Sequence, residues 1–134
     1  HGTIDGRSLT VDGRSEPPII GVALDGVGPV AAIRSTPESA QWHGDPVWEH
    51  AGGPMQFLRS SWEPWAADGD GDGVMDPHDL DDAAATAARY LCASGHDLDS
   101  GSTWASAIHS YNHAQEYVDA VHAAATAYAQ RAAR

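Results

Sequence analysis

The chain has 134 residues, a length that favours a single domain. Its residues are 42% hydrophobic and 19% charged, which is too apolar a composition for a disordered tail. Seven basic residues, all of them Arg, stand against 19 acidic ones, and the net charge of −12 would repel a phosphate backbone or an anionic membrane. We therefore exclude nucleic-acid binding, and we expect no membrane insertion because no apolar run reaches the roughly 18–20 residues of a span.

The first part of the chain, residues 1–53, is rich in Gly, Pro, Asp and Ser, and Asp-Gly turn dipeptides recur in it. We therefore predict that this part is mostly loop. Two short β-prone pieces, 8–11 and 19–24, lie between the turns and predict one small hairpin or extended ribbon. A long stretch of loop inside a compact domain is often functional.

In residues 54–134, the apolar residues are spaced as in amphipathic helices. The spacing predicts four helices, marked in order by Met55, Leu58 and Trp62; by Leu80, Ala84, Ala87 and Leu91; by Trp104, Ile108 and Tyr111; and by Tyr117, Val121, Ala124 and Tyr128. Gly95 is expected to end the second helix, and Asn112 with Gln115 fits a capping box at the start of the fourth. The chain is therefore expected to be mainly α, with a loop-rich or short β-hairpin N-terminal part.

The single cysteine, Cys92, lies between Leu91 and Ala93 in the second predicted helix. A free thiol in such an alanine-rich stretch usually behaves as a small buried hydrophobe. We therefore expect a buried Cys92 and no disulfide within the chain.

The strongest local signal is the acidic loop 68–79, which matches an EF-hand loop position by position. The predicted calcium ligands are Asp68, Asp70, Asp72, the Val74 carbonyl, Asp76 and Asp79. Crowded carboxylates repel one another unless a cation neutralises them, so we expect a structural calcium ion and no organic cofactor. Asp79 stands where glutamate is usual, which predicts weaker coordination. The alternative is a solvated acidic turn in which Asp76 caps a helix begun at Pro77.

Four motifs occur in one order: GPMQFLRSSW at 53–62, the DGDGDG start of the acidic loop, ARYLC at 88–92 and SYNH at 110–113. Together they resemble the lytic murein transglycosylases of the membrane-bound transglycosylase B type, and actinobacterial members are the most similar. The resemblance implies a lysozyme-like, mainly helical catalytic domain over residues 1–134. Such a domain cleaves the N-acetylmuramic acid to N-acetylglucosamine bond of peptidoglycan and leaves a 1,6-anhydromuramoyl end.

That reaction, as the family performs it, uses one glutamic acid that protonates the leaving oxygen and then acts as a base toward the C6 hydroxyl of the sugar. The family carries this acid in an E-S-x-H-G pattern, whose last two letters resemble His1-Gly2. The resemblance therefore implies a catalytic glutamate three residues before His1, a domain truncated at its N-terminus and no catalytic residue within the chain, which leaves the activity of this fragment open. Glu49 is the weaker candidate within the chain, weighed against a solvated loop acid. Arg59 departs from the family pattern, which usually has proline there.

The resemblance also implies that Met55, Gln56, Tyr111 and Asn112 bind substrate in one groove. In such a groove an amide can hydrogen-bond acetamido groups, and apolar surfaces can pack on the sugar rings. The structural alternatives are core packing for Met55 and helix capping for Asn112, and Phe57 is expected to be core.

The implied partner is the glycan strand of peptidoglycan, and the implied protein is an extracytoplasmic monomer that is secreted or associated with the cell wall. A second class of protein stays open: a non-catalytic, calcium-stabilised module that binds the cell wall or another protein, similar to a dockerin. Dockerin-like modules duplicate the calcium loop, whereas this sequence has one such loop.

Overall fold

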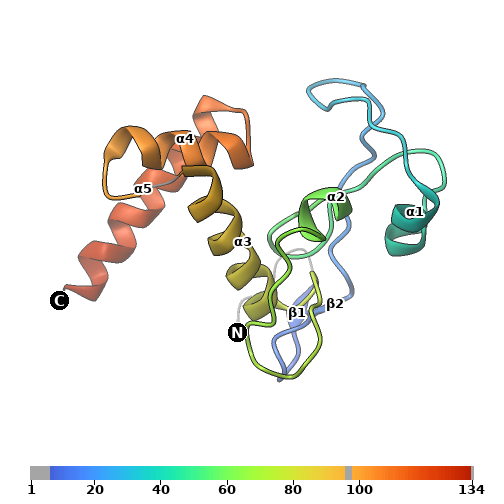
Figure 1. Ribbon diagram of the computed structural model, residues 1–134, viewed down its shortest axis with the longest axis horizontal. Helices are drawn as coiled ribbons and strands as arrows, with labels where there is room; N and C mark the ends of the chain where they lie inside the picture. Colours follow the sequence, from blue (N-terminus) through green and yellow to red (C-terminus); the bar gives the residue numbers. More distant parts are fainter. Residues whose placement is uncertain (1–6, 96–97, 134) are drawn as a thin grey trace. The chain divides into compact units, whose positions relative to one another are not determined.

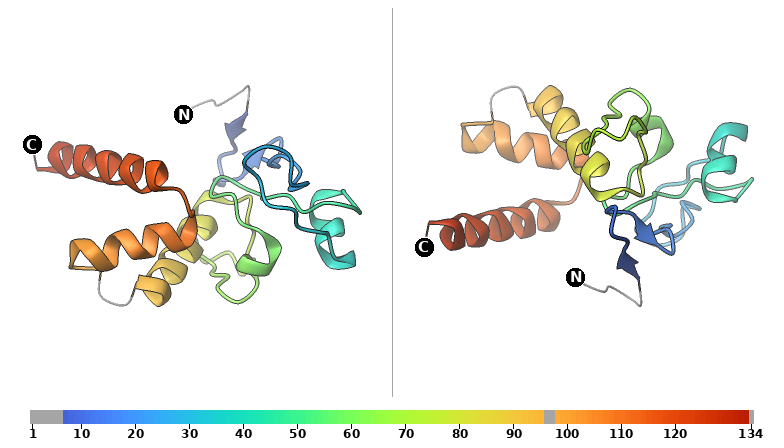
Figure 2. Two further views of the ribbon diagram at one scale, coloured as in Figure 1. Left: turned by 90° about the horizontal axis from the view of Figure 1, so that it is seen from above. Right: turned by 90° about the horizontal axis from the view of Figure 1, so that it is seen from below.

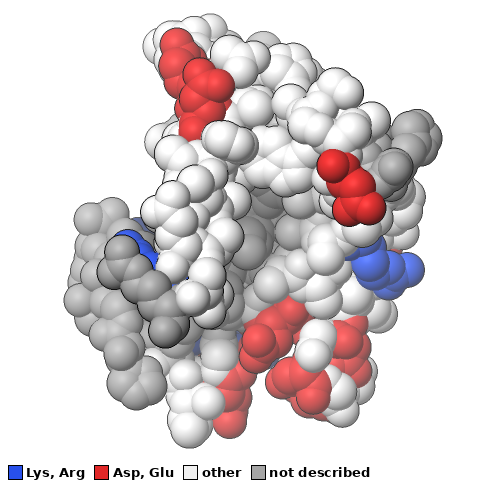
Figure 3. Space-filling model, turned by 90° about the vertical axis from the view of Figure 1, so that its left-hand side faces the viewer, with Lys and Arg blue, Asp and Glu red and all other residues white. Residues whose placement is uncertain are grey.

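The computed structural model describes residues 7–95 and 98–133. The chain divides into two compact units, residues 1–87 and 88–134. The described residues form five helices and one two-stranded sheet (Figure 1). Among those residues, no helix is both long enough and apolar enough to cross a membrane. On the face shown in Figure 3, acidic side chains cover more of the surface than Lys and Arg, in line with the net charge of −12.

The N-terminal sheet is a short antiparallel hairpin of β1 (Ser8–Leu9) and β2 (Ser15–Glu16). Its turn contains Gly13 at φ 86°, a left-handed conformation that glycine adopts without steric cost. A hairpin was expected here, but residues 15–16 pair with β1 instead of the β-prone piece at 19–24. Residues 19–24 are extended and pair instead with the segment 47–53, through a bridge between Ile20 and Gly52.

Three extended segments, 19–25, 32–35 and 47–53, pair through isolated bridges instead of forming a regular sheet. They meet at Glu49, whose N–H donates to the Ile33 carbonyl at 3.0 Å and whose carbonyl accepts from the Leu24 N–H at 2.9 Å. The Ile33 N–H in turn donates to the Leu24 carbonyl at 2.9 Å. Each segment is therefore held by the other two.

Helix α1 (Pro37–His43) lies in the part of the chain predicted to be mostly loop. Thr36 and Ser39 form a capping box at its start, Pro37 occupies the first turn, and Gly44 ends it at φ 87°. All of these signals are present in the sequence. The helix was missed because seven residues are too few to show a periodic apolar face.

Helix α2 (Arg59–Trp62) is shorter than the helix predicted from Met55 onward. The backbone of Gln56 is left-handed, at φ 51°, and a right-handed helix cannot pass through such a residue. Phe57 and Trp62 are 3% and 6% exposed, and their ring centroids lie 5.4 Å apart edge to face. Phe57 is therefore core, as expected.

The three later helices match their predicted places and are α3 (Leu80–Gly95), α4 (Gly101–Tyr111) and α5 (Gln115–Ala132). The apolar spacing was sufficient for these elements because each is at least 11 residues long. In the second unit, α4 and α5 pack against each other (Figure 2).

Two local predictions on these helices are wrong. Ala114 is the N-cap of α5, without a side-chain capping bond. Asn112 instead ends α4, and its Oδ1 accepts a hydrogen bond from the Ala114 N–H at 3.1 Å. Cys92 is exposed, because nine residues at about 100° each place it opposite the buried Ala83 on α3.

The close packing of Gly53 yields a prediction about stability. A Cβ built on Gly53 would lie 1.7 Å from the Pro77 carbonyl oxygen, whereas one built on Gly44 would meet nothing within 4 Å. Both glycines have a positive φ, so Gly44→Ala measures the conformational cost alone. We expect Gly44→Ala to lower the free energy of unfolding by about 1 kcal/mol and Gly53→Ala by about 3 kcal/mol or more in urea titrations. Equal losses for the two variants would contradict the packing argument.

Candidate functional site

The segment 47–53 ends in a tight turn formed by Gly53 to Gln56. The Gly53 N–H donates to the Ile19 carbonyl at 2.8 Å, and the Gly53 carbonyl accepts from the Gln56 backbone N–H at 3.1 Å. The Gln56 side-chain Nε2 donates to the same carbonyl at 2.9 Å. The turn is therefore closed by both the backbone and the side chain of Gln56.

Gln56 is exposed and left-handed, which costs an L-residue other than glycine roughly 1–2 kcal/mol. Residues held in such conformations concentrate at functional sites. The Gln56 amide also leaves no room for a side chain at position 21, because a Cβ built on Gly21 would lie 2.6 Å from the Gln56 Oε1. Met55, its neighbour in the turn, is half-buried, so part of its side chain is available for contact.

A cavity of about 390 Å³ lies in the first unit, between α1, α2 and the extended segments. Its lining residues are Ile33, Arg34, Thr36, Glu38, Ser39, Glu49, Arg59, Ser60 and Glu63. The volume is within the usual range for sites that hold small molecules. The sequence predictions had included only Glu49 of these residues as a site candidate.

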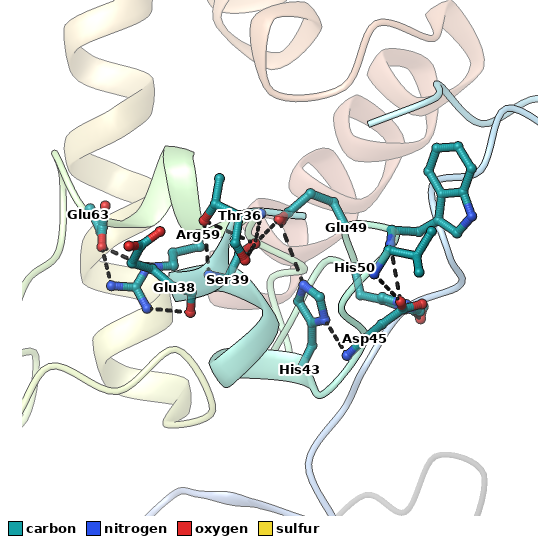
Figure 4. A network of polar contacts seen from close by, with 12 residues as sticks. Thr36, Glu38, Ser39, His43, Asp45, Glu49, His50, Arg59 and Glu63 are labelled. Atoms are coloured by element: carbon teal, nitrogen blue, oxygen red, sulfur yellow. Dashed lines mark hydrogen bonds and ion pairs between the residues drawn. The ribbon is translucent and has the colours of Figure 1, made fainter. Parts of the chain in front are cut away.

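Glu49 is 6% exposed and is therefore buried, unlike a solvated loop acid. The Ser39 hydroxyl donates to its Oε1, and the Nε2 of His43 lies 3.8 Å from the same oxygen (Figure 4). The Asp45 N–H donates to the His43 Nδ1 at 3.2 Å, so the imidazole proton resides on Nε2 and faces the carboxylate. Helix α1 thus covers Glu49 with one hydrogen-bond donor, the Ser39 hydroxyl, and one turn later with the His43 imidazole, which lies too far from the carboxylate for a hydrogen bond.

His50, the next residue, forms an ion pair on the other side of the segment. Its Nδ1 lies 2.8 Å from the Gly21 carbonyl oxygen and its Nε2 lies 3.0 Å from the Asp45 Oδ2. Burial lowers the pKa of His50, but the hydrogen bonds to Asp45 and Gly21 outweigh burial and raise the pKa overall. The hydrogen bond from His50, aided by the Val47 and Trp48 N–H groups, lowers the pKa of Asp45 to about 2.

The acidic loop brings together one carboxylate oxygen each from Asp68, Asp70 and Asp82, all within 4.8 Å of one another. Asp82 is 2% exposed, and it accepts hydrogen bonds from the Gly69 N–H at 2.6 Å and the Asp76 N–H at 2.8 Å. The sequence prediction missed Asp82 because it lies in the first turn of α3, beyond the twelve-residue loop pattern. The signal available was an additional carboxylate three residues after Asp79.

The other predicted ligands have different local contacts. Asp79 is 5% exposed and caps α3, since its Oδ1 accepts from the Asp81 N–H at 2.8 Å. Asp76 forms an ion pair with Arg14 at 2.5 Å. Asp72 accepts a hydrogen bond from the Val74 N–H at 2.7 Å, and Val74 is exposed. Among the described residues, only Asp68 and Asp70 of the predicted set lie in the three-carboxylate group.

The chemistry of this group fits a hard cation. The Asp72 N–H lowers the pKa of Asp70, but desolvation and the charges of Asp72, Asp79 and Asp82 outweigh this and raise it. Asp68 shows the opposite shift, because hydrogen bonds from the Gly73 and Gly71 N–H groups lower its pKa. Repelling carboxylate oxygens at this spacing are the ligand type that calcium prefers.

In the second unit, Tyr111 lies between two other tyrosines. Its ring centroid is 5.8 Å from that of Tyr90 and 6.4 Å from that of Tyr117. Burial raises the pKa of Tyr111 well above its usual range. Tyr111 and Asn112 belong to the second unit and Met55 and Gln56 to the first, so the groove predicted for these four residues stays a prediction.

His1 and Gly2, which resemble the end of a catalytic motif, lie outside the described residues.

Comparison with known protein families gives one finding. The family model described as the transglycosylase SLT domain matches residues 39–126. The match includes most of α1, Glu49, the Gln56 turn, the acidic loop and most of α5. No curated protein and no solved structure matches the chain.

The ion pair of Asp45 and His50 yields a prediction of pH dependence. The lowered pKa of Asp45 contributes stability above its usual value of 3.8, and that stability is lost as the pH falls toward about 2. The raised pKa of His50 contributes stability below its usual value of 6.5, and that stability is lost as the pH rises through the raised pKa. The difference in unfolding free energy between the wild type and Asp45→Asn should therefore be largest between pH 3.8 and pH 6.5, where both groups are charged. Asp119→Asn on α5 is the charge-matched control and should give a flat difference, and a flat profile for Asp45→Asn would refute the pairing.

Proposed function

We propose a function from the premise that the chain belongs to the transglycosylase SLT domain family, whose model matches residues 39–126. The chain is an enzyme of the lytic transglycosylase class within the lysozyme-like superfamily, and peptidoglycan is its substrate class. The family match over most of the chain is the observation that carries this assignment. The cell wall as site of action in turn supports an extracytoplasmic location.

Within this class, the proposed reaction is cleavage of the N-acetylmuramic acid to N-acetylglucosamine bond with formation of a 1,6-anhydromuramoyl end. The sequence motifs, which resemble the membrane-bound transglycosylase B type and its actinobacterial members, support this product. The proposed acid is a glutamate three residues before His1. It protonates the glycosidic oxygen and then removes the proton of the C6 hydroxyl, which closes on the anomeric carbon.

The proposed substrate contacts are Met55, Gln56, Tyr111 and Asn112. The left-handed, exposed Gln56 supports this role, because its amide is held in place by the turn while its Oε1 remains an acceptor for a sugar N–H or hydroxyl. A half-buried Met55 offers an apolar surface for a sugar ring.

The proposed metal is a structural calcium ion with Asp68, Asp70 and Asp82 as its central ligands. Asp72, the Val74 carbonyl, Asp76 and Asp79 complete the proposed loop, as the EF-hand spacing predicts. The ion would neutralise the acidic loop and hold it in one conformation. No step of the reaction is assigned to it.

Calcium binding is tested by thermal unfolding in millimolar calcium and in chelator. A ligand that binds only the folded state stabilises it, by about 2.7 kcal/mol at a hundredfold excess over its Kd. We expect the wild type to melt at a higher temperature in calcium and Asp82→Asn to lose most of this shift. Asp119→Asn removes the same charge from α5 and should keep the shift. Coincident melting curves of the wild type in the two buffers would exclude a structural calcium site.

The reaction is tested by incubating purified sacculi with the chain and separating the soluble products. Removal of a catalytic acid typically lowers the rate by roughly 10²–10⁴-fold, so we expect negligible 1,6-anhydromuropeptide from residues 1–134 alone. A longer protein with a glutamate three residues before His1 should release this product. Release of the product by residues 1–134 alone would instead point to Glu49.

Gln56→Gly in the longer protein separates substrate contact from folding. Glycine relieves the left-handed backbone, which offsets the loss of the hydrogen bond from the Gln56 side chain to the Gly53 carbonyl, so the thermal stability should change little. Product formation should nevertheless fall, because the amide is gone. Wild-type activity in this variant would remove Gln56 from the proposed contacts.

A further inference from the structure

Two histidines at the end of α4 form a pair that the proposed chemistry does not use. The imidazole rings of His109 and His113 lie with their centroids 5.5 Å apart and their planes at 77° to each other. His109 is in the last turn of α4, and His113 follows the C-cap residue Asn112 in the connection to α5. Both side chains are exposed within the second unit. The two rings are therefore neighbours although the helix ends between them.

The nitrogens of this α4 histidine pair are available to a ligand. In the described part of the chain, no hydrogen bond or ion pair joins either imidazole to another group. The other close pair, His43 and His50, differs in this respect. His50 contacts Gly21 and Asp45 through its two ring nitrogens, and the His43 Nδ1 accepts from the Asp45 N–H. A metal ion could bind that pair only by breaking these contacts.

The separation of the two α4 rings fits one shared metal ion. A zinc ion lies about 2.1 Å from a ligating imidazole nitrogen and hence about 3.2 Å from the ring centroid. Two imidazoles on one tetrahedral ion therefore have centroids about 5.3 Å apart, close to the 5.5 Å observed. The ion must also lie in both ring planes, and planes at 77° intersect, whereas those of stacked rings do not. Exposed side chains rotate readily enough to bring one nitrogen of each ring to that intersection.

The surroundings of the pair determine the class of ion. The two histidines line a cavity of about 430 Å³, and its other lining residues are Ala105, Ser106, Ser110 and Gln115. None of these residues carries a carboxylate, the group that calcium and magnesium prefer, whereas imidazole is a ligand of zinc, copper and nickel. Gln115 donates through its Nε2 to the Asp119 Oδ1 at 2.9 Å, which leaves its Oε1 as a further oxygen ligand. The site therefore suits a transition metal.

We propose that His109 and His113 together bind one divalent transition-metal ion of the zinc class, with water in the positions that the protein does not fill. Such an ion would link the last turn of α4 to the connection 112–114 and restrain that connection. The proposed calcium ion is instead held by carboxylates, so the two sites select different metals. No step of the proposed reaction depends on the ion at the histidine pair.

Calorimetric titration of the 134-residue chain with zinc chloride tests the site, in millimolar calcium so that the acidic loop does not compete. We expect His109→Ala and His113→Ala each to weaken zinc binding at least about tenfold, because each variant leaves a single imidazole. The double variant should bind hardly more weakly than either single variant, since one remaining imidazole holds an ion no better than any other exposed histidine. This lack of additivity distinguishes one shared ion from two independent ones.

His122→Ala and Cys92→Ser are the matched controls. His122 is an exposed histidine on α5, and Cys92 is an exposed thiol of a type that also binds zinc. Both variants should keep the affinity of the wild type. Undiminished zinc binding in the double variant, additive losses from the two single variants, or loss of binding in either control would overturn the proposal.

Thermal unfolding gives a second readout that does not depend on activity. Both ligands are exposed, so the alanine variants should melt close to the wild-type temperature without zinc. Zinc in excess over its Kd should raise the Tm of the wild type, because an ion that binds only the folded arrangement stabilises it. The double variant should show no such rise, and equal rises in the two proteins would refute the histidine site.

Discussion

The hydrogen bonds around the backbone of Glu49 are the constraint on which the first unit depends. Glu49, Ile33 and Leu24 bond to one another in a closed set, so three segments without a regular sheet fix each other's positions. Loss of one partner would leave the backbone groups of the other two unpaired, which costs more than the bond itself contributes. The same set positions the Glu49 side chain under α1 and directs residues 50–53 into the Gln56 turn.

The Gln56 turn and the acidic loop are mechanically connected. Gly53 packs against the Pro77 carbonyl so closely that no side chain fits between them, and Pro77 directly follows Asp76 in the acidic loop. The Asp76 N–H donates to Asp82, a member of the three-carboxylate group. The proposed ion would therefore also restrain the segment on which the Gln56 turn rests, although the two features are formed by different parts of the sequence.

The sequence predicted the features that are encoded by a repeated local pattern, and it missed those that depend on a single residue or on distant partners. Helices α3, α4 and α5 followed from apolar spacing, because a long amphipathic face is a repeated signal. Helix α1 depends on its caps at Thr36 and Gly44, a signal present only once. The left-handed Gln56 has no signature in residue type, since positive φ is expected of glycine or asparagine. Asp82 joins Asp68 and Asp70 only because α3 begins directly after the loop. The burial of Glu49 depends on pairing with distant segments, which local patterns do not contain.

The strained backbone of Gln56 also has a consequence for the choice of residue. Glycine would adopt φ 51° without steric cost. It would, however, remove the side-chain amide that donates to the Gly53 carbonyl. The glutamine thus keeps a hydrogen-bonding group in the turn at a cost in local stability, and strain of this kind is typical of functional sites.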